Sequence, residues 1–151
     1  MSIVGLDVSV VEIEVDIRPG LQSFHIVGLA GKAVQESKDR VSAALKNSGF
    51  KMPAKHITVN LAPANLVKNE TFYDLAIALG ILLSSAQIKN ISLDDIFWGE
   101  LSLDGKTKGT QGALVIADGA ARLGYKNLYL SKINAFEAGI VAGINVYGAV
   151  S

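Results

Sequence analysis

The segment from Phe72 to Ser85 most constrains the fold, because apolar side chains occupy nearly every side of it when it is drawn as a helix. A helix that is apolar all round has to be covered by other elements of the chain. With 151 residues, half of them hydrophobic, the chain is long enough to build that cover. We therefore expect a single domain, residues 1–151, with this helix at its centre.

Strands are predicted where apolar and polar residues alternate. Residues 11–17 place Val and Ile at every second position with Glu12, Glu14 and Asp16 between them, which is typical of a strand with one wet side. Residues 56–61 alternate in the same way. Because Pro19 and Gly20 break the first strand, residues 21–27 are expected to return beside it as a hairpin.

The remaining elements mix helices with short strands. Three-four spacing predicts a helix over 30–48, closed by Gly49. A further helix is expected over 111–123, closed by Gly124. Strands are expected over 97–103, 125–130 and 144–147, with a short helix over 134–141. Asp104-Gly105 is a strong hairpin signal. This mixture predicts an α+β (mixed α/β) fold, a mixed sheet packed with helices. The last strand ends close to Ser151, so we expect a domain of a longer protein.

Composition excludes several classes of protein. The absence of cysteine excludes a disulfide scaffold, a thiolate metal site and a cysteine nucleophile. The longest apolar run, 75–86, is shorter than the roughly 18 residues that a membrane span needs. No basic segment followed by an apolar one opens the chain, so a secretory signal is not predicted. We expect a cytoplasmic protein with no membrane partner.

Glycines before the helix at 30–48 suggest a phosphate-binding loop, because helix N-terminal amides attract anions. The full G-x-x-x-x-G-K-[ST] motif would need Gly at position 26 and a hydroxyl at position 33. The chain has Ile26 and Ala33 there. Close packing between strand and helix explains Gly28 and Gly31 better than a bound nucleotide does.

Other candidate groups are also explained more simply by structure. His25 and His56 have no further ligands at metal-binding spacing, so no metal site is predicted. Asp74 opens the apolar helix, where an acid is stabilised by the helix dipole, although a catalytic role is the alternative. Glu100 is either functional or part of an ion pair at the edge of a strand.

Charge is unevenly distributed although the net charge is zero. Residues 30–68 carry seven bases and two acids, a net charge of +5. This block is either an ordinary solvated surface or a basic face for phosphate or an acidic partner. We expect Lys38 and Arg40 to be exposed because they lie off the apolar stripe, and Lys68 to lie in a loop. These three are the candidate contacts with nucleic acid or a partner.

Seven segments together resemble one family in order along the chain. They are VEIEVDI (11–17), FHIVGL (24–29), ESKDRV (36–41), TVNLAPA (58–64), DLAIA (74–78), GELSLDG (99–105) and Glu137-Ala138. With these segments the chain resembles the N-terminal domain of the magnesium-chelatase-like AAA+ proteins, the YifB/ComM family. Asn60, Asp74 and Glu100 fall in these segments as structural motif residues. The Lys68-Asn69-Glu70 loop departs from the usual pattern.

The resemblance implies a fold like the Lon proteolytic domain and the second domain of ribosomal protein S-five. It implies that the parent protein carries a AAA+ ATPase module, with ATP and magnesium bound there and no cofactor in this chain. It also implies a hexameric ring. In the family, ComM is a DNA helicase that promotes branch migration during natural transformation, so DNA and the ATPase module are the expected partners.

The Lon likeness raises a peptidase as a rival function. Lon enzymes use a Ser–Lys dyad, and an ungapped alignment places its members at Phe72 and Ile116, whose side chains have no transferable proton. We therefore expect a non-catalytic interaction or regulatory domain of a ComM/YifB-type ATPase. The alternatives are a structural ring-forming module without DNA contact and, less favoured, a degenerate Lon-type peptidase.

Overall fold

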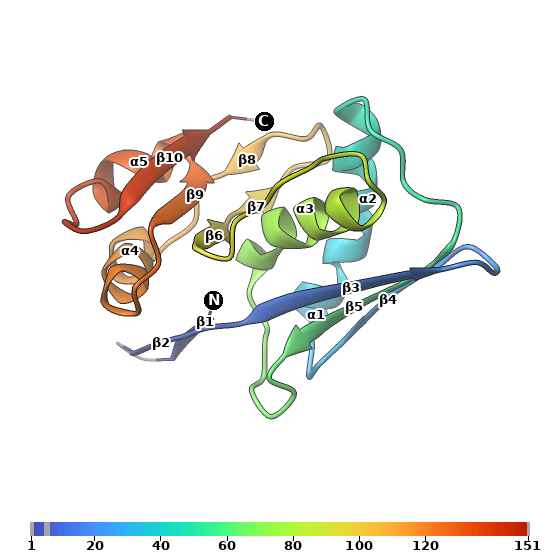
Figure 1. The fold of residues 1–151 in the computed structure, drawn as a ribbon, viewed down its shortest axis with the longest axis horizontal. Coiled ribbons are helices and arrows are strands. Elements are labelled where there is room, and N and C mark those ends of the chain that lie inside the picture. Colours follow the sequence, from blue (N-terminus) through green and yellow to red (C-terminus); the bar gives the residue numbers. More distant parts are fainter. Residues whose placement is uncertain (1, 5–6, 151) are drawn as a thin grey trace.

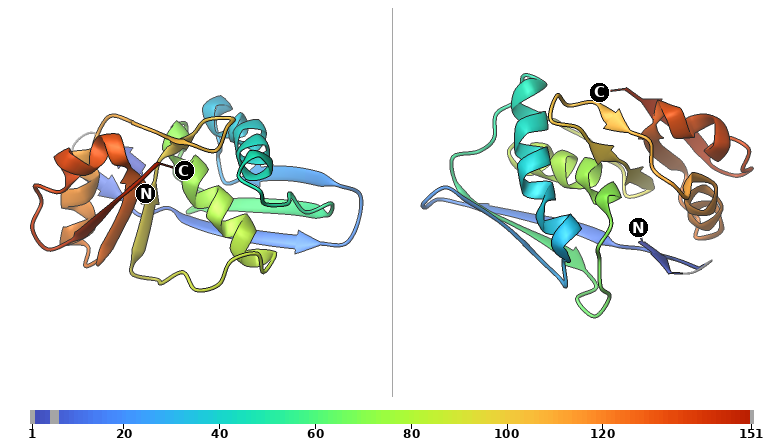
Figure 2. Two further views of the ribbon diagram at one scale, coloured as in Figure 1. Left: turned by 90° about the horizontal axis from the view of Figure 1, so that it is seen from above. Right: turned by 180° about the vertical axis from the view of Figure 1, so that it is seen from behind.

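The computed structural model describes residues 2–4 and 7–150, in which two three-stranded sheets lie on either side of a central helix (Figures 1 and 2). That helix, α3, covers Asp74–Ser84 and follows a 3-10 turn, η1, at Thr71–Tyr73. Two ribbons accompany the sheets: β1 (Ser2–Val4) with β2 (Asp7–Ser9), and β7 (Glu100–Leu101) with β8 (Thr107–Lys108). The predicted α+β class is confirmed.

The first sheet contains β3 (Glu12–Arg18), β4 (Ser23–Val27) and β5 (His56–Ala62) in the order β3-β5-β4. The predicted hairpin between β3 and β4 is wrong, because β5 lies between them, antiparallel to β3 and parallel to β4. The inward residues of β5 explain its central place: Ile57, Val59 and Leu61 are at most 1% exposed. The predicted wet side of β3 is confirmed, since Glu12, Glu14 and Asp16 are all exposed.

The helix expected over 30–48 is divided into α1 (Lys32–Gln35) and α2 (Ser37–Asn47). At the division, the carbonyl oxygen of Ala33 accepts a hydrogen bond from the Arg40 side chain at 3.0 Å. Beyond it, α2 buries its small-residue stripe, including Val41, Ala44 and Leu45. The stripe therefore survives although the helix is not continuous.

Helix α3 packs against β3, β6 and α2 and buries Ile77, Ala78, Ile81 and Leu82. The prediction that α3 is covered on every side is wrong, because one side of the helix is open. Leu83 is 41% exposed, and Leu79 is only partly buried. Both line a groove of about 400 Å³ between α3, the start of β3 and the segment before β6.

The second sheet contains β6 (Asp95–Trp98), β9 (Asn127–Ser131) and β10 (Asn145–Ala149), all parallel, in the order β10-β9-β6. Helix α5 (Lys132–Ala138) packs on β9, β10 and α4 (Ala113–Arg122). Leu128 and Leu130 of β9 are fully buried. Among the described helices, none has the length and hydropathy needed to cross a membrane.

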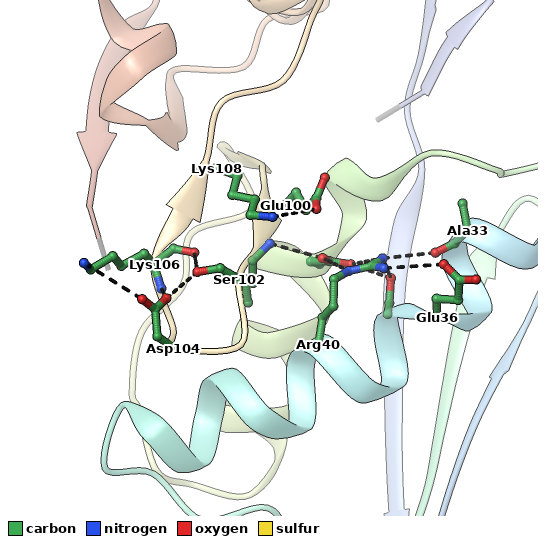
Figure 3. A network of polar contacts seen from close by, with 11 residues as sticks. Ala33, Glu36, Arg40, Glu100, Ser102, Asp104, Lys106 and Lys108 are labelled. Atoms are coloured by element: carbon green, nitrogen blue, oxygen red, sulfur yellow. Dashed lines mark hydrogen bonds and ion pairs between the residues drawn. The ribbon is translucent and has the colours of Figure 1, made fainter.

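The hairpin predicted at Asp104-Gly105 is confirmed, with Glu100 opposite Lys108 and Leu101 opposite Thr107. Figure 3 shows how the turn is fixed: the Asp104 carboxylate accepts hydrogen bonds from the Ser102 hydroxyl and, at 3.1 Å, from the Lys106 amide. The Ser102 hydrogen bond lowers the pKa of Asp104. Gly105 has φ +90°, a conformation that favours glycine. This hairpin places Glu100 close to the start of α3.

Candidate functional site

Asp74, the first residue of α3, is fully buried and joins three parts of the chain. Its carboxylate accepts hydrogen bonds from the Ser37 hydroxyl, from Arg40 Nε at 2.7 Å and Nη2 at 3.1 Å, and from the Leu101 amide at 3.1 Å. Asp74 thus lies in the first turn of α3, as expected, and its carboxylate also ties α2 and β7 to that helix.

Arg40 lies at the centre of the same network (Figure 3). Its side chain is 17% exposed and also donates to the Ala33 carbonyl, while Glu36 lies 3.9 Å away. The hydrogen bond to Asp74 raises the pKa of Arg40, so the guanidinium stays charged. The prediction that Arg40 is exposed is wrong. Its N–H donors bond to acceptors inside the domain and are not directed at solvent, where a phosphate could bind.

Lys68 lies in a loop, as expected, but its side chain is buried at 1% exposure and is therefore not available for contact with nucleic acid or a partner. The ammonium group donates to three backbone carbonyl oxygens: Gly28 at 2.6 Å, Leu61 at 2.8 Å, and Pro63. Burial lowers the pKa of Lys68. The three acceptors oppose that shift, because only the protonated amine has three N–H donors. Lys68 thus fastens the 62–70 loop to the ends of β4 and β5.

Residues 68 and 69 contact the start of α1, the place where the sequence suggested a phosphate-binding loop. The Gly31 amide donates to the Lys68 carbonyl at 2.7 Å, and the Ala33 amide donates to Asn69 Oδ1 at 3.1 Å. A Cβ on Gly31 would lie 2.3 Å from Asn69 Oδ1. These contacts support close packing as the reason for the glycine, because the amides that would hold an anion are already bonded.

The other predicted site residues lie apart from this network. Lys38 is partly exposed on α2, and Asn60 is half-buried on β5 opposite Glu14 and Val27. Glu100 forms the ion pair that was one of its two expected roles, with Lys108 Nζ 3.8 Å from its Oε1. The structure therefore brings together Arg40 and Asp74, with Glu100 on the adjoining hairpin, and separates them from Lys38 and Asn60.

The histidines lie on the outer side of the first sheet. His25 and His56 have ring centroids 5.4 Å apart, and His56 Nδ1 is hydrogen-bonded to the Ser23 hydroxyl. Within residues 2–4 and 7–150, no three side chains of His, Cys, Asp or Glu are grouped in a way that could hold a metal ion.

The two positions that a Ser–Lys dyad would occupy are both in the core. Phe72 is 5% exposed and contacts the Trp98 ring at a centroid distance of 5.4 Å, and Ile116 is fully buried in α4. An alkyl side chain and a benzyl side chain can neither attack a carbonyl nor take up a proton. These positions therefore contribute packing.

A cleft of about 560 Å³ borders Phe72 and was not predicted from the sequence. Its walls come from the η1 segment, from β7 and from the loop that enters α4; the lining residues are Glu70, Thr71, Phe72, Glu100, Gly109, Thr110, Gln111, Gly112 and Val115. Gly112, at the start of α4, has φ +97°. In the sequence, only Gly109 and Gly112 hint at this cleft. The three segments that form it are separated along the chain and come together only in the folded domain.

Replacing Lys68 by methionine should destabilise the fold by about 2 kcal/mol, because three buried carbonyl oxygens lose their donor while the cost of burying a charge disappears. Urea unfolding followed by circular dichroism measures the change. Lys46→Met, at an exposed position, is the control and should stay within about 0.5 kcal/mol of the wild type. Equal stability of the Lys68 and Lys46 variants would refute the fastening role.

Comparison with known proteins identifies clear relatives. The family model described as subunit ChlI of Mg-chelatase matches residues 13–134. The chain is 44% identical over 146 residues to competence protein ComM of Haemophilus influenzae, covering 96% of this chain and 28% of that protein. It is 41% identical over 140 residues to the uncharacterized protein YifB of Escherichia coli, covering 92% and 28%.

The uncharacterized protein Rv2897c of Mycobacterium tuberculosis is 41% identical over 145 residues, which cover 95% of this chain and 29% of that protein. The chain thus spans between a quarter and a third of the length of the curated relatives that it matches.

Proposed function

Because this chain belongs to the Mg-chelatase subunit ChlI family of AAA+ proteins, we propose that it is a non-catalytic interaction and regulatory domain of a ComM/YifB-type ATPase. The parent protein would act as a DNA helicase or branch-migration factor in recombination or natural transformation, in the cytoplasm. The partners of this domain would be the ATPase module, neighbouring subunits of a homo-oligomeric ring, and DNA.

One observation supports the proposal: the charged candidate residues Arg40, Asp74 and Lys68 are engaged in hydrogen bonds within the domain. Arg40 bonds Asp74, and Lys68 bonds three carbonyl oxygens. A catalytic acid or base has to reach a substrate atom within hydrogen-bond distance. Asp74 and Lys68 are at most 1% exposed. This use of the motif residues favours a domain that acts by contact over one that acts by chemistry.

The residues present do not fit a nucleotide or its magnesium ion. The Walker-type hydroxyl is absent at Ala33, and the amide of that residue is bonded to Asn69. We propose that ATP and magnesium bind in the ATPase part of the parent protein.

Contact with DNA through this block uses the bases whose side chains lie outside the internal networks. In the block of residues 30–68 these are Lys32, Lys38, Lys46, Lys51 and Lys55. About three phosphate contacts give a log–log salt slope near −3 on duplex DNA and about −2 on single strands. Such a surface would bind at the non-specific level of roughly 10⁻⁴ to 10⁻⁶ M, and a ring would raise its avidity.

Fluorescence anisotropy with single-stranded and forked DNA tests this contact. We expect the triple variant Lys32→Glu/Lys38→Glu/Lys46→Glu to lose DNA binding and, with it, the dependence of affinity on salt concentration. The matched control, Lys89→Glu/Lys126→Glu/Lys132→Glu, makes the same change of charge at exposed lysines outside the block and should keep both. Equal binding by wild type and both variants would remove DNA contact by this surface and leave the structural ring-forming module as the better description.

A further inference from the structure

The cleft beside Phe72 combines features that select a particular kind of ligand. Its volume of about 560 Å³ lies within the range of roughly 300 to 1,000 Å³ that binding sites occupy. It is built from a pre-helix segment, a hairpin strand and a loop, which belong to separate parts of the chain. The Asp74 network fixes two of these parts, because Leu101, next to Glu100, bonds the residue that opens α3.

Two carboxylates give the cleft its charge. Glu70 is exposed, and its carboxylate has no hydrogen-bond or ion-pair partner among the described residues. Glu100 is 23% exposed; the ion pair it forms among the described residues is with Lys108, which is 56% exposed and has its Nζ 3.8 Å from Oε1. An exposed pair of this length contributes little and is easily exchanged. The cleft therefore presents acceptors for a cation and repels a phosphate backbone.

The rest of the lining suits a long side chain. Phe72 and Val115 provide apolar wall, against which an aliphatic stem can pack while its charged head stays at the carboxylates. Thr110 has a buried hydroxyl oxygen with no hydrogen-bond partner among the described residues. Its backbone is fixed by Asn134, whose side chain bonds the Thr110 amide at 2.9 Å and carbonyl at 2.8 Å.

A bare metal ion is a poorer match, because the described residues offer no group of three His, Cys, Asp or Glu ligands. We propose that this cleft docks a basic side chain, arginine or lysine, presented by a segment of a partner protein. Charge-assisted hydrogen bonds from the ammonium or guanidinium group to Glu70 and Glu100 hold it. This inference rests on the proposed function, since it names the partner chemistry of an interaction domain.

The test uses the whole 151-residue chain and three probes. The first is a labelled decapeptide of alanine and serine with one central arginine, the second is the same peptide with neutral citrulline in place of arginine, and the third is spermidine. Binding is measured by anisotropy, and the site is located by amide chemical shifts. We expect the arginine peptide to bind about tenfold more tightly than the citrulline peptide and to shift amides at 70–72, 100 and 109–112.

Two variants locate the charge requirement. Glu70→Gln and Glu100→Gln should each weaken the arginine peptide severalfold, whereas Glu14→Gln, an exposed acid of β3 outside this cleft, should not. Equal binding of arginine and citrulline peptides, or shifts elsewhere, would overturn the proposal. Spermidine binding as tightly as the peptide would make the cleft a polyamine site instead. If none of the three probes binds, the proposal for this cleft fails. The proposed interaction domain is tested separately, by DNA binding and by removing the domain from the parent protein.

Discussion

Replacing Asp74 by alanine should destabilise the domain by about 3–5 kcal/mol, the cost of breaking a buried ion pair by removing one partner. The variant leaves the 17% exposed Arg40 side chain without its carboxylate and frees the Leu101 amide. Urea unfolding measures the loss. Since small domains have only about 5–15 kcal/mol of stability, much of the variant should be unfolded in mild urea.

An exposed ion pair provides the control for Asp74. Asp118 lies 2.9 Å from Arg122 in α4, with both side chains more than half exposed, so Asp118→Ala should cost under about 1 kcal/mol. The double variant Asp74→Ala/Arg40→Leu should recover part of the loss, because it removes the unpaired charge. Equal effects of the Asp74 and Asp118 substitutions would contradict the central place of this network.

Replacing Ile81 by aspartate should prevent folding. Ile81 is fully buried in α3, and an unpaired carboxylate at such a site costs several kcal/mol, about the whole stability of a domain. Leu79→Asp is the matched variant in the same helix. Because Leu79 lines the open groove, its carboxylate can reach water, and we expect a soluble, folded protein. Circular dichroism and thermal melting distinguish the two; unfolding of both would mean that the groove is closed in solution.

Local pattern was enough to locate most elements of the fold. The alternation at 11–17 identified β3 and its wet face, and Asp104-Gly105 identified the β7–β8 turn. The order of strands was not available from this information. Pairing of β3 with β5 joins Glu12 to Ala62, and nothing local distinguishes that partner from the nearer β4. The prediction that α3 is covered on every side was wrong for a similar reason. The apolar composition of a helix does not show which of its sides faces a groove between the two sheets.

The candidate site was less predictable than the fold. Lys68 was judged by its place in a loop, but its carbonyl partners at Gly28 and Leu61 come from two other elements. Arg40 lies off the apolar stripe of α2, as the helical spacing indicated, and still faces the interior because Asp74 comes from a different helix. Periodicity reports the direction of a side chain on its own element and carries no information about what that side chain meets.

The most direct test of the interaction-domain account compares the full-length ATPase implied by the proposal with the same protein lacking residues 1–151. ATP hydrolysis and branch migration of DNA are measured side by side on both proteins. The account predicts that basal ATP hydrolysis stays within about twofold while branch migration falls by at least about tenfold, a barrier increase near 1.4 kcal/mol. Branch migration at the full rate without the domain would contradict it.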